Sequence, residues 1–202
     1  MNFISKKGGF YTFEQWVKSI DKISKRQSTL LIGIDGSGGS GKSTLPEKIK
    51  ENCTNLTVVH MDDFYFPSSQ IKNIHPAQKP VGADFDWERL LNQVLEPLSQ
   101  DREGKYQRYD WKTDELAEWH IVPVGGIVII EGVYSTRKEL ASKYDYKIWV
   151  ECSREIRLSR GLNRDGEEAR GMWEKNWMIS EDIYVEDHKP SERAELVVDG
   201  TK

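Results

Sequence analysis

A glycine-rich stretch near residue 40 carries the residue types that bind a chain of phosphates. Gly36 is followed by four residues and then by Gly41-Lys42-Ser43, which is the spacing of a phosphate-binding loop. Glycines let the backbone turn tightly and bring its N–H groups onto phosphate oxygens, while the lysine can reach the β- and γ-phosphates and the serine hydroxyl can bind Mg²⁺. The residues expected to hold a nucleoside triphosphate are Gly36, Ser37, Gly38, Gly39, Ser40, Gly41, Lys42, Ser43 and Thr44.

The segments on either side of this loop support the same interpretation. Leu30–Asp35 is a nearly unbroken apolar run, which is typical of a strand buried on both faces, and Leu45–Ile49 begins a helix. A flexible Gly/Ser linker is the alternative. A linker has no need to end in Gly-Lys-Ser-Thr between a buried strand and a helix, so the pattern favours the phosphate loop.

Acidic residues follow two other predicted strands. The pair Asp62-Asp63 comes at the end of Leu56–Met61, and Glu131 follows Ile127–Ile130. Ligands bind at the carboxyl ends of the strands in open α/β sheets, so we expect these acids to lie beside the phosphate loop, although one aspartate could instead cap a turn. Because Mg²⁺ prefers oxygen ligands, the predicted metal ligands are Ser43, Glu131 and Asp62.

A row of arginines lies on one predicted helix. Ser153 caps a helix over residues 154–164, and its arginines recur at spacings of three and four, at Arg157, Arg160 and Arg164. On an ordinary helix such a row would be a solvated surface. Here the helix follows a strand at Tyr146–Val150, so its start is expected near the phosphates. The pattern therefore favours a lid, over about residues 154–177, that brings arginine to the transferring phosphoryl group.

The remaining elements are predicted from local signals. Thr12–Gln15 forms a capping box that opens a helix within residues 1–28. Pro67–Ala83 is irregular. Asp86 is expected to cap a helix from Trp87 to about Leu95, with Pro97 marking its end. Two aromatic-rich runs, 106–111 and 118–122, flank a polar turn and predict a β-hairpin, and the last strand is expected at 194–198.

Composition places the chain among globular proteins. Its 202 residues are 31% charged and 37% hydrophobic, which fits one domain spanning residues 1–202 with a sizeable core. A formal net charge of -4 argues against a general nucleic-acid partner. Cys53 and Cys152 are far apart in the sequence, which suggests buried thiols in a reducing compartment. There is no long apolar segment and no signal-peptide pattern at Met1–Gly9. We therefore expect no membrane partner and a cytoplasmic location, with the oligomeric state, a homo-oligomer included, left open.

Taken together, the motifs resemble the uridine kinase–phosphoribulokinase group of phosphate-loop (P-loop) kinases. The similarity runs from about Leu30 to Gly200 and rests on four segments, namely Gly36–Thr44, Asp62–Tyr65, Ile129–Gly132 and Arg157–Asp165. The resemblance implies the α/β, three-layer P-loop NTPase fold, with a five-stranded parallel sheet flanked by helices, a small lid and a β-hairpin near the acceptor site. It also implies ATP and Mg²⁺ as cofactors and a small-molecule phosphate acceptor.

The resemblance also implies roles for individual residues. Asp62 matches the acid that takes the proton from the acceptor hydroxyl, and Arg164 matches a lid arginine that touches the ATP phosphates. The catalytic residues implied are Asp62, Lys42 and Arg164, and Arg160 joins Arg164 among the residues that bind ATP. On the acceptor side the residues implied are Tyr65, Tyr109, Arg157 and either Asp84 or Asp86, between which the sequence does not decide.

Two departures from the family pattern concern the acceptor. Uridine kinases carry a histidine shortly after a Tyr-Asp-Phe segment, whereas here Tyr109-Asp110-Trp111 is followed by Lys112, Thr113 and Asp114. A nucleoside-contacting arginine of the family is replaced by Gly161. A site that hydrogen-bonds one base loses discrimination when its donors change, so the sequence supports phosphoryl transfer better than it supports uridine.

The function expected is ATP-dependent transfer of a phosphoryl group to a hydroxyl of a small acceptor, a nucleoside such as uridine. Two alternatives stay open. One is a kinase for a different alcohol, such as a sugar phosphate or a vitamin-like acceptor. The other is a non-catalytic nucleotide-binding regulatory protein, although the Asn-Lys-x-Asp guanine signature of GTPase switches is absent from the sequence.

Overall fold

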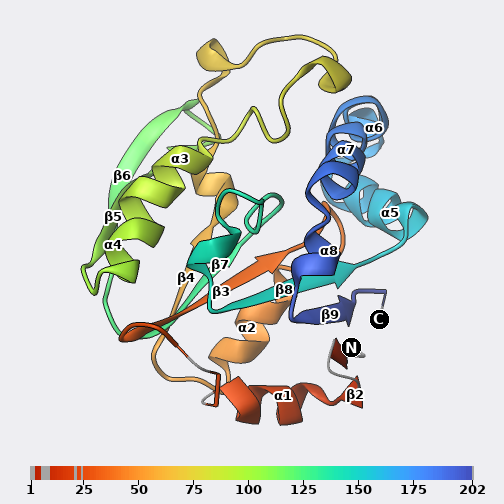
Figure 1. Ribbon diagram of the computed structural model, residues 1–202. Coiled ribbons are helices and arrows are strands. Elements are labelled where there is room, and N and C mark those ends of the chain that lie inside the picture. Colours follow the sequence, from red (N-terminus) through yellow and green to blue (C-terminus); the bar gives the residue numbers. More distant parts are fainter. Residues whose placement is uncertain (1–2, 6–9, 21, 24, 202) are drawn as a thin grey trace.

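A sheet with five parallel strands at its centre organises the protein. The computed structural model describes residues 3–5, 10–20, 22–23 and 25–201. Figure 1 shows the sheet running through the middle of the molecule, with helices on both faces. The order of the parallel strands is β4 (Leu56–His60), β7 (Gly126–Glu131), β3 (Thr29–Asp35), β8 (Tyr146–Glu151) and β9 (Leu196–Asp199). The five-stranded parallel sheet predicted from the sequence is confirmed.

Two short strands extend this sheet beyond β9. Strand β1 (Phe3–Ser5) pairs antiparallel with β9, and β2 (Phe10–Tyr11) pairs antiparallel with β1. The sequence predicted a helix within residues 1–28 and no strand. Strands of two and three residues are too short to show an alternating pattern, so they were missed.

The two faces of the sheet bury different sets of side chains. On one face α1 (Phe13–Ile20) and α2 (Thr44–Lys50) pack against alternate strand residues such as Ile32 and Ile148. On the opposite face Leu31 lies in the cluster that contains Val94 and Leu98. Successive strand residues point to opposite faces, so one apolar strand such as β3 serves both layers. The result is the expected three-layer arrangement.

The helix that covers the second face continues past a proline. It comprises α3 (Trp87–Leu90), a π-helical turn at Leu91–Leu95, and α4 (Glu96–Ser99). Asp86 caps it as predicted, its side chain accepting from the Arg89 N–H at 3.0 Å. The prediction that Pro97 ends the helix was wrong. The wide turn shifts the hydrogen-bond ladder, so Pro97 stands in the first turn of α4, where a missing N–H costs little.

The segment after β8 is helical along most of its length. It contains α5 (Arg154–Asp165), α6 (Arg170–Met172), a π-helical turn at Trp173–Trp177, α7 (Met178–His188) and α8 (Pro190–Arg193). Ser153 accepts from Ile156 N at 3.5 Å, as expected for the cap of α5. The segment predicted as a lid to about residue 177 continues as a helix to His188. A small cluster of Leu162, Trp173 and Met178 packs α5 against it.

A hairpin and a long loop lie at one edge of the sheet. Strands β5 (Gly104–Asp110) and β6 (Glu115–Val122) form the predicted hairpin. The loop from Tyr65 to Phe85 arches over the strand ends (Figure 1), and a β-bridge between these two residues closes its base. Within the described part of the chain, no helix is both long and apolar enough to cross a bilayer.

Candidate active site

One cavity lies at the carboxyl ends of β3 and β4, between the phosphate loop, the α5–α7 segment and the arching loop. Its volume is about 760 Å³. A cavity of this size is typical of small-molecule sites. Of the residues predicted from the sequence it brings together Gly38, Gly39, Gly41, Lys42, Ser43, Thr44, Asp62, Tyr65, Asp84, Arg160 and Arg164.

The other predicted residues lie outside this lining. Gly36, Ser37 and Ser40 form the buried side of the phosphate loop. Glu131, Tyr109 and Arg157 each contact a residue that lines the cavity. Asp86 pairs instead with Arg89, which does not line it.

The phosphate loop has a backbone that requires glycine. The φ angles of Gly39 and Gly41 are 75° and 91°, in the left-handed region that other residues rarely adopt. The loop closes on itself through a hydrogen bond from Ser40 N to Ser37 O at 3.1 Å. The glycine spacing in the sequence therefore corresponds to a tight turn that leads into α2.

The three arginines of α5 have different surroundings. Arg157 Nε donates to Gly38 O at 3.2 Å, and Arg160 Nη1 donates to Gly39 O at 3.3 Å and to Gly200 O at 2.7 Å. Arg164 pairs with Asp165 at 2.7 Å, and its side chain is 69% exposed. Two of the arginines thus hold the phosphate-loop backbone. Arg160 and Arg164 both line the cavity, and Arg164 is the most exposed of the three.

Ser43, in the phosphate loop, and Glu131, at the end of β7, lie together. Ser43 Oγ donates to Glu131 Oε1 at 3.1 Å, and His60 Nδ1 is 3.0 Å from Glu131 Oε2. Burial acts to raise the pKa of Glu131, but the hydrogen bond from His60 and the charge of Lys42 outweigh it and leave that pKa lowered. A buried carboxylate that stays ionised beside a hydroxyl is a suitable pair of oxygen ligands for Mg²⁺.

His60 was missed by the sequence analysis. It ends β4 two residues before Asp62 and lies directly opposite Glu131 in the parallel register of β4 and β7. Its hydrogen bond to Glu131 raises the pKa of His60. The signal in the sequence was its position at the end of the strand that carries Asp62, but a single histidine there does not reveal its partner.

Asp62 follows β4 and faces the cavity. Its side chain is exposed to water in the cavity while protein surrounds the carboxyl group on the other sides. The loss of solvation raises the pKa of Asp62, and the nearby charge of Lys42 opposes that rise. A carboxylate with a raised pKa, close to a phosphate-binding lysine, has the properties of a general base.

Aromatic rings line the wall opposite the phosphate loop. The ring of Tyr65 is 4.6 Å from Trp111 and 5.0 Å from Phe85, centroid to centroid, and Phe85 is 5.3 Å from Tyr134. All four line the cavity. Only Tyr65 among them was predicted as a site residue, because aromatic residues on a hairpin or after a strand more often serve the core.

The structure distinguishes between Asp84 and Asp86, a choice that the sequence left open. Asp84 lines the cavity and pairs with Lys79 at 2.8 Å. Asp86 caps α3 and pairs with Arg89. Of the two aspartates, Asp84 is therefore the one that lines the cavity.

Tyr109 and Asp114 hold the hairpin to the arching loop. The Tyr109 hydroxyl donates to Asp114 Oδ1 at 2.6 Å, and Ser68 N donates to the same oxygen at 2.8 Å. Tyr109 is buried and does not line the cavity. Both residues thus contribute to the position of the wall rather than to its surface.

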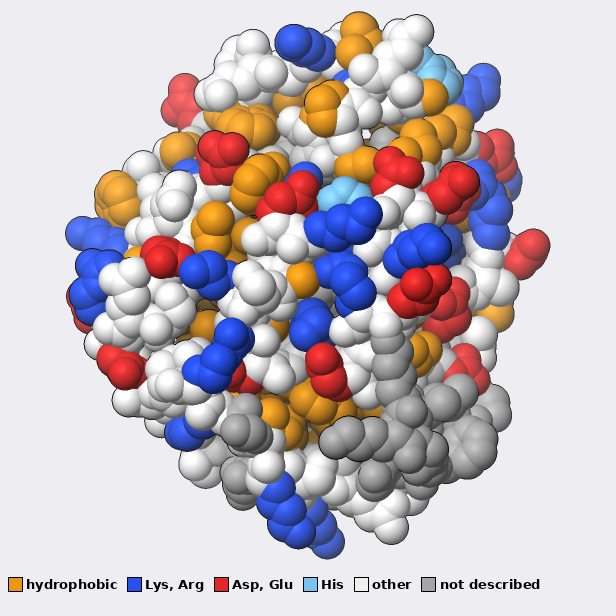
Figure 2. All heavy atoms as spheres, in the orientation of Figure 1, with side chains coloured by type: hydrophobic (Ala, Val, Ile, Leu, Met, Phe, Trp, Pro, Cys, Tyr) orange, Lys and Arg blue, Asp and Glu red, His pale blue; other side chains and the backbone are white. Residues whose placement is uncertain are grey.

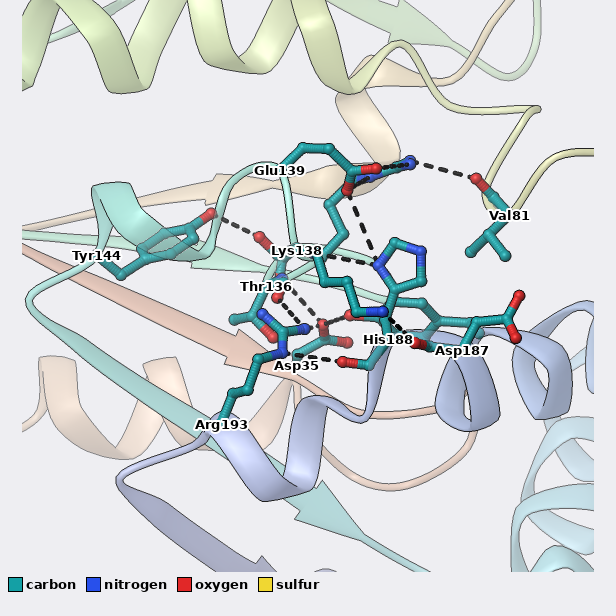
Figure 3. A network of polar contacts seen from close by, with 12 residues as sticks. Asp35, Val81, Thr136, Lys138, Glu139, Tyr144, Asp187, His188 and Arg193 are labelled. Atoms are coloured by element: carbon teal, nitrogen blue, oxygen red, sulfur yellow. Dashed lines mark hydrogen bonds and ion pairs between the residues drawn. The ribbon is translucent and has the colours of Figure 1, made fainter.

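A buried polar network anchors the start of the phosphate loop (Figure 3). The Asp35 carboxyl, at the end of β3, accepts from Gly36 N at 2.7 Å, from Thr136 Oγ1 at 2.8 Å and from the Tyr184 hydroxyl at 2.5 Å. Arg193 then donates to Thr136 O at 3.0 Å. Burial raises the pKa of Asp35, against these hydrogen bonds. The network ties the loop to α7 and α8, far along the chain.

The surface around this region carries mixed charge. On the face in Figure 2, basic and acidic side chains are interspersed, with no broad area of one sign. The face in view therefore offers no broad basic field, and an anion in the cavity would be attracted by the groups that line it, such as Lys42 and Arg164.

Comparison with known proteins agrees with this geometry. The model of the phosphoribulokinase/uridine kinase family matches residues 31–180. Uridine-cytidine kinase A of Dictyostelium discoideum is 30% identical over 154 residues, which cover 72% of this chain and 30% of that protein. A uridine kinase of Ureaplasma parvum is 28% identical over 156 residues, 73% of this chain and 74% of its own length.

Solved structures show the same fold. A possible uridine kinase from Bacillus stearothermophilus superposes with a TM-score of 0.72 over 92% of this chain and 96% of that one, at 24% identity. A putative fructose transport system kinase from Silicibacter gives a TM-score of 0.73 over 93% and 98%, at 20% identity. The family model matches most of this chain, and the chain has the fold of the family's P-loop kinases. This chain therefore belongs to the phosphoribulokinase/uridine kinase family.

Proposed function

We propose that this protein is an ATP-dependent kinase that transfers the γ-phosphate to a hydroxyl of a small, uncharged acceptor with a flat ring, a nucleoside such as uridine. The observation that carries the proposal is the position of Asp62. It lies in one cavity with the phosphate loop and with the aromatic wall of Tyr65, Phe85, Trp111 and Tyr134. A proton acceptor between a triphosphate site and a ring-binding wall suits transfer to a hydroxyl.

In the proposed reaction, the phosphate loop and Lys42 bind the triphosphate. Asp62 accepts the proton of the acceptor hydroxyl as its oxygen forms a bond to the γ-phosphorus. The bond from that phosphorus to the β–γ bridging oxygen breaks, and ADP leaves. Arg164 neutralises charge on the transferring group. Most of the rate enhancement comes from positioning and electrostatics.

The residues that would hold Mg²⁺ are Ser43 and Glu131, whereas Asp62, which the sequence also suggested as a ligand, is given the role of base here. The hydrogen bond between Ser43 and Glu131 shows that hydroxyl and carboxylate oxygens already converge. Mg²⁺ in kinases takes one or two carboxylates together with phosphate oxygens and water, so a larger protein cluster is not needed. When bound, the ion would offset the negative charge of the phosphates.

The wall opposite the loop favours an uncharged acceptor. Aromatic faces suit a flat base, and Asp84 can accept hydrogen bonds from ribose hydroxyls. Among the described lining residues in the part of the sequence from Tyr65 to Tyr134, Lys79 is the one with a basic side chain. It is paired with Asp84. A sugar phosphate would need a cation for the phosphate that it already carries.

The class of acceptor is better supported than any one base. Asp114, near the position where uridine kinases carry a base-reading histidine, is hydrogen-bonded to Tyr109 and Ser68. Gly161 replaces the family's nucleoside-contacting arginine. The relatives named uridine kinase and uridine-cytidine kinase support a nucleoside, and these two departures leave the choice of base to other contacts.

A panel of acceptors tests the proposal. The purified protein is incubated with ATP and Mg²⁺, and ADP release is followed with uridine, cytidine, adenosine, a pentose phosphate, glycerate and pantothenate. We expect turnover with nucleosides and none with the pentose phosphate. The control is Lys42→Ala, which should lose ATP binding and transfer together. Preferred turnover of a sugar phosphate or a vitamin-like alcohol would select the second kinase hypothesis, and ATP binding without transfer to any acceptor would favour a regulatory protein.

A further inference from the structure

The peptide units of Gly38, at the crest of the phosphate loop, are held from both sides. Arg157 Nε donates to Gly38 O at 3.2 Å, and Gly38 N donates to Glu181 Oε1 at 3.0 Å. The two side chains also bond to each other, from Arg157 Nη2 to Glu181 Oε2 at 2.5 Å. One residue of the loop, one of α5 and one of α7 thus form a closed ring of contacts.

The pair is removed from solvent and leaves the loop little freedom. The side chains of Arg157 and Glu181 are 8% and 7% exposed. A β-carbon at Gly38 would lie 2.9 Å from Glu181 Oε1, and one at Gly39 would lie 2.5 Å from the carbonyl oxygen of Arg157. The crest of the loop therefore packs directly against both helices, and only glycine fits there.

The contacts to carbonyl oxygens also fix the direction of N–H groups. In a trans peptide the carbonyl of one residue and the N–H of the next point in opposite directions. Arg157 holds Gly38 O and Arg160 holds Gly39 O. The N–H of Gly39 consequently points away from the arginine that holds Gly38 O, and is left for an anion. A loop whose N–H groups are already aligned does not have to be ordered by the nucleotide.

Stability alone does not explain the pair. Taking two charges out of water costs about as much as their attraction returns, so a buried ion pair is weak evidence for added stability. Burial raises the pKa of Glu181, and the charge of Arg157 opposes that rise. A buried pair at this position is better explained by the geometry that it imposes on the loop.

We propose that Glu181 and Arg157 are a positioning pair that presets the Gly38 peptides, so that the phosphate loop is ready to bind the triphosphate of ATP. The inference rests on the proposed function. It gives Arg157 a different role from the acceptor contact expected from the sequence, and it gives a role to Glu181, which lies outside the motifs of the loop and of α5.

The test is the affinity for ATP of Glu181→Gln. Glutamine has the same size and can still accept from Gly38 N, but it lacks the charge that holds Arg157. The matched control is Asp182→Asn, since Asp182 pairs with Arg154 between the same two helices, with side chains 54% and 45% exposed and no contact to the loop. Calorimetry with Mg²⁺ gives the Kd for ATP, steady-state kinetics give the KM of the acceptor, and thermal melts report folding.

We expect Glu181→Gln to weaken ATP binding by about tenfold or more, since it leaves a buried charge without its partner, while the acceptor KM stays unchanged and Asp182→Asn behaves as wild type. An ATP affinity equal to that of wild type would overturn the inference. So would tighter binding, because it would show that the carboxylate competes with the phosphates for Gly38 N.

A second variant keeps the inference testable if Glu181→Gln does not fold. Arg157→Lys retains the positive charge but loses the planar fork that bonds Gly38 O and Glu181 together, and it should also weaken ATP binding, by about tenfold. Unchanged affinity in this variant would overturn the positioning role. Wild-type ATP binding without transfer contradicts the proposed kinase but leaves the effect of the pair on ATP measurable, whereas a wild type that binds no ATP overturns both.

Discussion

The indole ring of Trp173 lies directly against Gly161. A β-carbon at residue 161 would be 2.4 Å from the ring, a distance that no side chain tolerates. Trp173 is 2% exposed, and its Nε1 donates to Asp165 Oδ2 at 3.0 Å. The glycine and the tryptophan therefore form one packing unit. A longer side chain at residue 161, such as the arginine that the resemblance to uridine kinases implies there, would not fit beside Trp173.

This contact predicts that Gly161→Ala destabilises the protein. The added methyl group must displace Trp173, and overpacking of this kind costs about 1–3 kcal/mol. Urea denaturation measures the loss. The control is Gly171→Ala on α6, where a β-carbon meets nothing within 4 Å, and alanine should leave stability equal or slightly higher. Equal stability of Gly161→Ala and wild type would show that Trp173 does not depend on the glycine.

The role of Asp62 predicts a loss of turnover with little change in ATP binding. Asp62→Asn removes the proton acceptor while keeping the size of the side chain, so kcat should fall by about 10²–10⁴-fold. Steady-state kinetics and calorimetry separate the two effects. Asp63→Asn is the control, because Asp63 accepts from the Tyr106 hydroxyl at 2.8 Å and does not line the cavity. Near-normal turnover of Asp62→Asn would remove it from the role of base.

Substitutions of Asp84 and Asp86 should affect different properties, the acceptor KM for Asp84 and the stability of the protein for Asp86. Asp84→Asn changes the carboxylate in the cavity, so the acceptor KM should rise several-fold while the KM for ATP is unchanged. Asp86→Ala removes the cap of α3 and should lower the free energy of unfolding by about 0.5–2 kcal/mol with normal kinetics. Steady-state kinetics and urea denaturation of both variants test these two expectations. A raised acceptor KM in the Asp86 variant alone would reverse the assignment.

The network around Asp35 predicts graded losses of stability. Tyr184→Phe deletes one hydrogen bond to the buried carboxyl and should cost about 1 kcal/mol. Asp35→Asn should cost more, because both carboxyl oxygens accept from donors, and an amide NH₂ must then face an N–H or a hydroxyl. Denaturant unfolding of both variants measures the two losses in the free energy of unfolding, which can then be compared. A smaller loss for Asp35→Asn than for Tyr184→Phe would contradict this account of the network.

The sequence by itself determined the parts of the protein that depend on local patterns. Apolar runs identified the five parallel strands, because strands buried on both faces need nearly continuous apolar residues. Spacing identified the phosphate loop, whose positive φ angles at Gly39 and Gly41 require glycine. The caps of α3 and α5 and the hairpin also follow from side chains a few residues apart. Pro97 was the exception, because a π-helical turn before it changed the hydrogen-bond ladder.

The tertiary structure decided which distant residues meet. Glu181 contacts Gly38 across 143 positions of the chain, and His60 meets Glu131 only through the register of two parallel strands. No local period encodes such pairs, since they depend on how helices and strands pack after the chain has folded. The same packing placed Asp84 in the cavity, Asp86 at a helix cap, and Arg157 on the loop backbone. The candidate site residues could therefore be named from residue types and spacing, while the partners of their charged groups came from the fold.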